Sequence, residues 1–307
     1  MTGTGRYGRG MSSAPPSPPV DPRVDWDLPP FGELSRTCHL DEATTRVLAA
    51  NPSPMTLDGT NTYLVGPPGH GEVVVVDPGP DDADHLAAVE TALAERDARV
   101  AAVVVTHHHQ DHAEAARPWA RRFGVEVHAA TREVASPNGR LLRDGDTVAI
   151  GGERLTVVAT PGHTRDHLSL RAPTGALLTG DHVLGRGTSV VAYPDGDLAA
   201  YLDSLRRVLA LGPDALYPGH GPALTRDPAA VLRYYAEHRR FREWQLLDAL
   251  SAGPATPAEL VARIYAEVDR RLWPAAEAST RAAIEMLADQ GRVRVDAADR
   301  VVLLDHG

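Results

Sequence analysis

The sequence predicts an α/β protein in which a layered sandwich is followed by a small domain of helices and a two-stranded ribbon. Three observations support this prediction. Strand-like and helix-like segments alternate over residues 38–227, with hairpins between them, which favours a sandwich over a purely parallel sheet. Short motifs of histidine, aspartate and glycine follow several predicted strands. From residue 228 to residue 307, helical patterns replace the alternation.

Residues 1–37 are predicted to form a flexible leader. They are rich in proline and glycine and bury too little apolar surface to offset the entropy lost on ordering. They have no apolar core of the kind that a signal peptide carries, and nothing in the chain approaches the roughly 20 apolar residues of a membrane span. We therefore expect a cytoplasmic protein without membrane contact, and removal of residues 1–30 should change little.

The composition is that of a globular protein, with 43% apolar and 23% charged residues. The formal net charge is −10. This acidity argues weakly against an electrostatic nucleic-acid binder, which usually shows a basic surface. A local basic patch remains compatible with it.

The sandwich region begins with two predicted strands, residues 61–66 and 72–77, and the second ends in a turn at Pro78-Gly79-Pro80. The other elements follow from apolar periodicity, β-branched runs and glycine turns. They are a helix at 84–96, a strand at 101–105, a helix at 113–123, strands at 125–128, 147–150, 154–160, 168–171 and 176–179, a helix at 198–211, and a strand at 215–217. Helices at 228–250, 254–265 and 275–290 and strands at 292–295 and 300–304 then outline a winged helix.

The most informative segment is residues 106–112, which read THHHQDH directly after a buried strand. Imidazole and carboxylate are the ligands that zinc prefers where thiolate is absent. His107 and His109 are two residues apart, so an extended segment points both to one side. Asp111 and His112 follow in the turn into a helix, where they can face a second ion. The alternative is a surface loop that binds metal adventitiously.

Three further motifs make that alternative less attractive. They contain His163 in TPGHT, Asp181 after a strand that ends at Thr179, and His220 in PGHG. Each places a metal-ligating side chain in a glycine-containing turn at the end of a predicted strand. Loops at one edge of a sandwich are where catalytic groups usually gather. One such motif is weak evidence, whereas four in series are strong.

These residues resemble the metallo-β-lactamase superfamily, whose pattern is H-x-H-x-D-H followed by a distant His, Asp and His. Residues 51–66 (NPSPMTLDGTNTYLVG), 160–167 (TPGHTRDH) and 217–222 (YPGHGP) resemble its β-lactamase-like protein 2 group, which also carries a C-terminal winged-helix-like domain. The resemblance implies an αββα sandwich, a hydrolase domain over residues 38–227 and a linker helix with a winged-helix-like domain over 228–307.

The resemblance also implies a ligand set for two metal ions, which we expect to be zinc, with manganese or iron as alternatives. One ion would be held by His107, His109 and His163, the other by Asp111, His112 and His220, and Asp181 would bridge them. Asp77 would organise the ligand loop without binding metal. A hydroxide shared by the two ions would attack the substrate. Asp181 and Asp111 would assist as catalytic residues, Asp111 by taking a proton from the bridging water.

Two assignments stay open from the residues alone. His167, four residues after His163, is either a catalytic group that contacts substrate or relays a proton, or a donor that steadies a ligand. The cluster of Arg239, Arg240 and Arg242 is either a solvated helix face or the rim of a site for an anionic substrate.

Three functions compete, because a fold does not fix a substrate. The resemblance implies first a phosphodiesterase that acts as an endoribonuclease on single-stranded RNA. The second is a hydrolase of small thioesters or esters, and the third is a nucleic-acid-binding regulator with a structural metal site. A basic groove leading to the metals would favour RNA, whereas a narrow apolar pocket would favour a thioester or ester. The C-terminal domain is expected to pack at the mouth of the active site or to support a homodimer.

Overall fold

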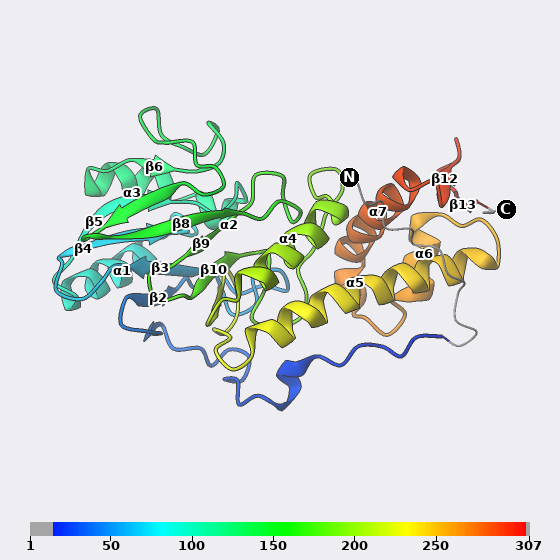
Figure 1. Cartoon of the computed structure of the whole chain (residues 1–307), viewed down its shortest axis with the longest axis horizontal. Coiled ribbons are helices and arrows are strands. Elements are labelled where there is room, and N and C mark those ends of the chain that lie inside the picture. Colours follow the sequence, from blue (N-terminus) through cyan, green and yellow to red (C-terminus); the bar gives the residue numbers. More distant parts are fainter. Residues whose placement is uncertain (1–14, 305–307) are drawn as a thin grey trace, which may run out of the picture.

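A computed structural model of the chain describes residues 15–304 and contains two sheets packed face to face (Figure 1). The first sheet has the order β1-β2-β3-β4-β5-β6 and the second β11-β10-β9-β8-β7. The strands of the first are β1 (Thr37–His39), β2 (Thr44–Leu48), β3 (Asn61–Val65), β4 (Glu72–Val76), β5 (Arg99–Val104) and β6 (Val127–His128). Those of the second are β7 (Thr147–Ile150), β8 (Glu153–Ala159), β9 (Leu168–Arg171), β10 (Leu177–Gly180) and β11 (Leu216–Pro218).

Helices cover both outer faces, so the αββα sandwich is confirmed. Helices α1 (Ala83–Glu95) and α3 (Ala116–Phe123) pack on the first sheet, and α4 (Leu198–Leu211) and α5 (Pro228–Ser251) pack on the second. The valines of β4 show how strand periodicity builds these layers. Val73 and Val75 face the helices, while Val74 and Val76 face the second sheet.

Two differences from the predicted elements have physical explanations. No strand was predicted at Thr44–Leu48, which reads TTRVL and shows no apolar pattern. In the structure it lies between β1 and β3, and its Thr44 and Arg46 are buried as fully as its apolar residues. The helix predicted at 113–123 begins later, as α3, and is preceded by a separate short helix, α2 (Gln110–Ala113). Pro118 has no N–H to donate to the carbonyl of Glu114, so the helical hydrogen-bond ladder is interrupted there.

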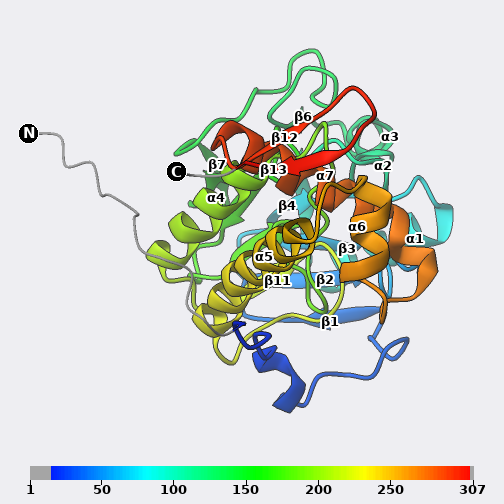
Figure 2. The same ribbon diagram turned by 90° about the vertical axis from the view of Figure 1, so that its right-hand side faces the viewer.

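The C-terminal domain contains the second half of α5, α6 (Pro257–Ile264), α7 (Trp273–Asp289) and the ribbon of β12 (Val293–Val295) and β13 (Val301–Leu303). Its own apolar core includes Leu250, Leu260 and Leu287. Helix α7 also packs on the sandwich through Ala282 and Met286. Figure 2 looks at the molecule from this end, with α5, α6 and α7 in front of the strands. No described helix is long and apolar enough to cross a membrane.

The expectation of a flexible leader needs correction for part of its length. Residues 1–14 lie outside the described residues, but Pro22–Asp25 form a short 3-10 helix and Arg23 is 4% exposed. The Arg23 guanidinium donates to the carbonyls of Leu184 (2.8 Å) and Gly187 (2.6 Å) and pairs with Asp21 (2.7 Å). A single well-placed arginine thus fixes a segment whose composition predicts disorder.

We expect Arg23→Ala to lower the free energy of unfolding by about 2–4 kcal/mol, because it removes two hydrogen bonds from a charged donor and the packing of the Arg23 side chain over Tyr234 and Tyr235. Chemical denaturation monitored by circular dichroism would measure this change. Val24→Ala is the matched control, since Val24 is 68% exposed. Equal stability of the Arg23→Ala variant and the wild-type protein would show that the contact does not stabilise the fold. Because Arg23 lies within residues 1–30, we expect removal of this segment to lower the free energy of unfolding as well.

Candidate metal centre

The motifs singled out in the sequence meet at one edge of the sandwich. Strands β4 and β5 are parallel neighbours in the first sheet, and β10 and β11 are parallel neighbours in the second. The carboxyl ends of parallel strands lie at the same edge, so the loops that follow them converge. Seven side chains come together there: His107, His109, Asp111, His112, His163, Asp181 and His220.

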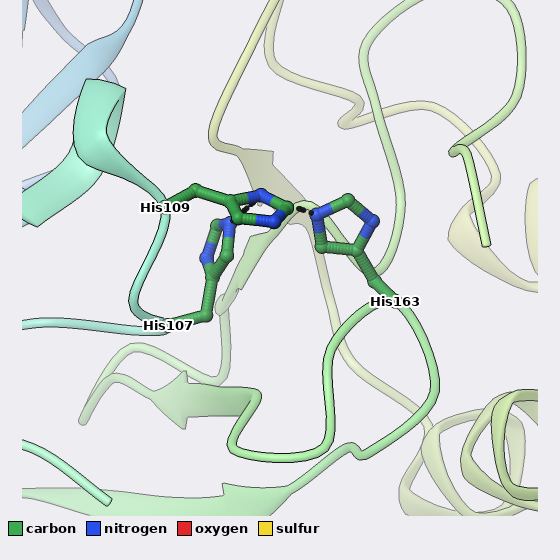
Figure 3. Close-up of side chains that lie close together, drawn as sticks. All are labelled: His107, His109 and His163. Carbon is green, nitrogen blue, oxygen red and sulfur yellow. Dashed lines mark hydrogen bonds between the residues drawn. The ribbon is translucent and has the colours of Figure 1, made fainter. Parts of the chain in front are cut away.

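Three imidazoles form the first group of potential metal ligands (Figure 3). The Nδ1 atom of His109 lies 3.1 Å from Nε2 of His107 and 3.1 Å from Nε2 of His163. Ligands about 2.0–2.1 Å from a tetrahedral zinc ion are about 3.3 Å apart. The three nitrogen atoms therefore have the spacing of a shared cation's ligands.

A second group combines Asp111, His112 and His220. The Nε2 atoms of the two histidines are 3.1 Å apart, and Oδ2 of Asp111 is 3.2 Å from Nε2 of His220. Asp181 lies between the groups. Its Oδ1 is 3.4 Å from Nε2 of both His112 and His220, and its Oδ2 is 3.6 Å from Nε2 of His163. One carboxylate therefore faces both groups, as a bridging ligand does.

Hydrogen bonds on the far side of three of the rings fix which nitrogen faces the centre. The Nδ1 atom donates to Asp77 from His112 (2.9 Å), to the Val190 carbonyl from His163 (2.6 Å) and to the Gly59 carbonyl from His220 (3.1 Å). A ring that donates through Nδ1 presents the lone pair of Nε2. The surrounding chain thus holds these rings in a metal-binding tautomer.

The electrostatics of the cluster also suit cations. Burial, together with the other imidazoles, holds the pKa of His107 well below its usual range and lowers that of His109 to about 4. Both rings are therefore neutral ligands at neutral pH. Burial opposes ionisation of Asp181, yet His220 and His112 hold the pKa of its carboxyl well below the usual range. His107 and His109 thus present neutral imidazoles, and Asp181 presents an ionised carboxylate. Burial opposes a charge on His112 and His220, but Asp181 raises the pKa of His112 well above its usual range and that of His220 to about 9, so a cation that binds there displaces a proton from each ring.

Asp77 organises the ligand loop, as the sequence resemblance implies. It adopts a left-handed φ of 51° directly after β4. Its carboxylate accepts hydrogen bonds from the backbone N–H and the hydroxyl of Thr106, each 2.8 Å, and from Nδ1 of His112. It therefore links the end of β5 to a ligand of the second group without facing the centre.

The catalytic role considered for His167 is not supported by its contacts. The ring is 1% exposed, its Nδ1 is 2.8 Å from the Thr160 hydroxyl, and its Nε2 accepts from the backbone N–H of Asp181 (3.1 Å). Both nitrogens are engaged within the protein, so His167 positions Asp181. His182 is fully buried against Tyr201, and the exposed His108 pairs with Asp166 (2.9 Å), so neither joins the seven.

Glycine at position 219 is required by the close packing of the centre. A Cβ atom there would lie 2.6 Å from Oδ1 of Asp181 and 2.7 Å from Cε1 of His112. We expect Gly219→Ala to fold but to displace these two groups and to lose at least half of its bound metal after gel filtration. Metal analysis of the purified protein would measure the loss, and full occupancy would show that the centre adapts to the methyl group.

A pocket leads from the centre toward the C-terminal domain. Its volume is about 320 Å³, and His163 and Asp181 form part of its wall. We call it the inter-domain pocket, because both domains line it. The sandwich contributes Pro54, Met55, Leu57, Leu184 and residues 186–190, and the C-terminal region contributes His238, Arg239, Arg242, Tyr265, Val268, Leu272, Ala275, Ala276 and Ser279. Sequence patterns could not reveal this pocket, since its walls lie far apart along the chain.

The fold and the centre together define a hydrolase of the metallo-β-lactamase type. The chain matches the metallo-β-lactamase superfamily over residues 55–220 and the β-lactamase-associated winged helix domain over residues 256–300, and it belongs to this superfamily.

Curated relatives give a finer comparison. The chain is 31% identical to a β-lactamase-like protein 2 homologue of Drosophila melanogaster over 83% of its own length and 91% of that protein. It is 33% identical to an atrochrysone carboxyl ACP thioesterase of Aspergillus fumigatus over 78% and 76% of the two chains. Among solved structures, a metallo-β-lactamase family protein from Thermus thermophilus superposes with a TM-score of 0.74 at 25% identity, covering 87% of this chain and all of that one.

Proposed function

We propose that this protein is a dinuclear zinc-dependent hydrolase of small thioesters or esters. The observation that carries the proposal is the inter-domain pocket, which begins at His163 and Asp181 and whose wall exposes mainly apolar surface between its polar side chains. A mainly apolar pocket with a few polar groups is the usual form of a small-molecule site. An acyl chain can occupy it while its carbonyl lies at the centre.

The proposed reaction uses the centre's residues in distinct roles. Two bound divalent ions would activate water and polarise the carbonyl. Asp181 would help to hold both ions, because its two oxygens face the two groups of proposed ligands. The Asp111 side chain is 31% exposed and can accept a proton from the attacking water. The water oxygen joins the carbonyl carbon, the C–S or C–O bond breaks, and the leaving group takes the proton.

Cleavage of single-stranded RNA, the first function implied by the sequence resemblance, receives less support. The basic side chains near the centre line a pocket that also has many apolar side chains, whereas an RNA strand binds in a basic groove that follows its backbone. The net charge of −10 points the same way. The A. fumigatus relative named as a thioesterase adds support for the carbonyl substrate.

A nucleic-acid-binding regulator receives the least support. On α7, the position of a recognition helix, Arg281 pairs with Glu277 (3.0 Å) and Asp299 (2.9 Å). The same helix buries Ala282 and Met286 against the sandwich. Its basic group and one of its faces are thus already engaged within the chain.

The test is a side-by-side assay of zinc-loaded protein on acyl thioesters of N-acetylcysteamine, from acetyl to octanoyl, and on single-stranded RNA. Asp181→Ala controls for contaminating enzymes. We expect turnover of thioesters that rises with acyl length until the pocket is full and that is lost in the variant. RNA cleavage that depends on Asp181, without thioester turnover, would replace the proposal with the phosphodiesterase.

A further inference from the structure

We propose that the inter-domain pocket contains an anion subsite formed by Arg239 and Arg242, and that the substrate carries a carboxylate or phosphate beyond its scissile carbonyl. This inference rests on the proposed function and narrows the class of substrate. The two arginines lie three residues apart on α5, so they share one face of that helix. Both line the pocket, together with His238 and Arg186.

Arg239 is buried and Arg242 is half-buried, and neither has a carboxylate partner among the described residues. Arg239 is 7% exposed, and its guanidinium donates to the Ser189 carbonyl and lies over the Tyr201 ring at 5.2 Å. Arg242 donates to the Ile264 carbonyl (3.2 Å) and to Gln245 (2.9 Å) and lies over Tyr265 at 4.4 Å. These contacts orient the two groups, but none of them carries a negative charge.

Several donors in this wall have no acceptor among residues 15–304. They are Nε of Arg239, Nε of Arg242 and Nε of Arg186. None of the three arginines takes part in an ion pair within the described part of the chain. Burying an unpaired charge is costly, and an anionic ligand would offset that cost. The wall therefore selects for an anion.

The pKa of the neighbouring His238 is also affected by the two arginines. Burial, Arg239 and Arg242 together lower the pKa of His238 to about 3. Its ring is therefore neutral and can donate one further hydrogen bond to an anion. The positive charge of the two guanidinium groups disfavours a proton on His238. The same charge attracts an anion that enters the pocket.

The subsite is close to the metal centre. Arg239 contacts the Ser189 carbonyl, and the next carbonyl, that of Val190, accepts from Nδ1 of His163. Apolar side chains such as Leu184 and Val190 line the same pocket. A substrate that fits has a carbonyl at the centre, a short apolar spacer and an anionic end.

Arg240 provides a matched control on the same helix. It is exposed and does not line the inter-domain pocket. The arginine cluster that the sequence left open therefore divides into two kinds of residue. Arg240 belongs to a solvated face, whereas Arg239 and Arg242 face the pocket.

The experiment compares length-matched acyl thioesters of N-acetylcysteamine with and without a terminal carboxylate: succinyl, glutaryl and adipyl against butyryl, valeryl and hexanoyl. A second arm places the carboxylate on the thiol instead. We expect zinc-loaded wild-type protein to prefer one anionic series by at least about tenfold in kcat/KM. Arg242→Gln should remove the preference, chiefly through KM, and Arg242→Lys should restore part of it. Arg240→Gln should retain it.

Calorimetric binding of glutarate gives a readout that does not need turnover. We expect its affinity to fall about tenfold in Arg242→Gln and to stay unchanged in Arg240→Gln. Equal kcat/KM for charged and neutral substrates, with glutarate binding independent of Arg242, would overturn the subsite while leaving the hydrolase proposal intact. Failure to hydrolyse any thioester, with Arg242-dependent glutarate binding, would instead contradict the proposed function and support the subsite.

Discussion

Replacing Asp181 by alanine is expected to lower the turnover of the best substrate by at least about 100-fold and to leave a folded protein. Residues that merely orient a metal ligand already contribute about 10–100-fold, and Asp181 faces both groups of ligands. The apolar cores that hold the sandwich together keep all of their side chains in this variant, so we expect it to fold. His109→Ala, which removes the nitrogen between His107 and His163, should have an effect of the same size.

Asp195→Ala is the matched control for this prediction. Asp195 is a carboxylate near the centre, with Oδ2 3.5 Å from Nε2 of the exposed His108; it could hold a cation with His108 and His109, but it belongs to neither of the two groups of proposed ligands. Initial rates, metal content and thermal unfolding should be measured for all three variants. Retention of more than a few per cent of activity in both Asp181→Ala and His109→Ala would contradict the assignment of the centre. An equal loss in Asp195→Ala would move the chemistry to the exposed histidine.

The layers of the fold could be predicted where one kind of side chain dominates a strand. Residues 72–77 read as a buried strand because four consecutive valines can be covered on both faces. The strand Thr44–Leu48 lacks that signal, since Arg46 is buried in it and donates to the Ser35 carbonyl. A buried charged side chain whose hydrogen-bond acceptor lies elsewhere in the chain interrupts the apolar pattern by which a buried strand is predicted.

The side chains of the candidate metal centre could be predicted because they occur in short motifs at strand ends. All seven proposed ligands lie together, although they come from loops as far apart as residues 107 and 220. The inter-domain pocket was not predictable for the opposite reason. Its wall joins single residues such as Leu57, Ser189 and Tyr265, which have no local pattern in common. The role of His167 could not be predicted either, because it depends on the partners of its two ring nitrogens, Thr160 and Asp181.

The second large effect is expected for Asp77→Asn, which should weaken metal binding at Asp111, His112 and His220 by about 10–100-fold. The same change should lower the free energy of unfolding by about 2–4 kcal/mol. Asp77 is 2% exposed, and its carboxylate accepts three hydrogen bonds, two from Thr106 and one from His112. In asparagine an NH₂ group replaces one of the two accepting oxygens. The donors that bonded to that oxygen lose their acceptor, and the NH₂ group itself finds no acceptor there. Asparagine tolerates a φ of 51°, so backbone strain does not contribute.

Zinc titration against a competing chelator, followed by chemical denaturation of the metal-free protein, separates the two effects. Asp81→Asn is the control, because the same charge is removed four residues away on an exposed side chain. If Asp77 acts only through the fold, the metal-free variant loses stability while the zinc affinity of its folded fraction stays normal. If it acts only on the ligand loop, the affinity falls at unchanged stability. We expect both to change, because one carboxylate holds the end of β5 and the ring of His112 together.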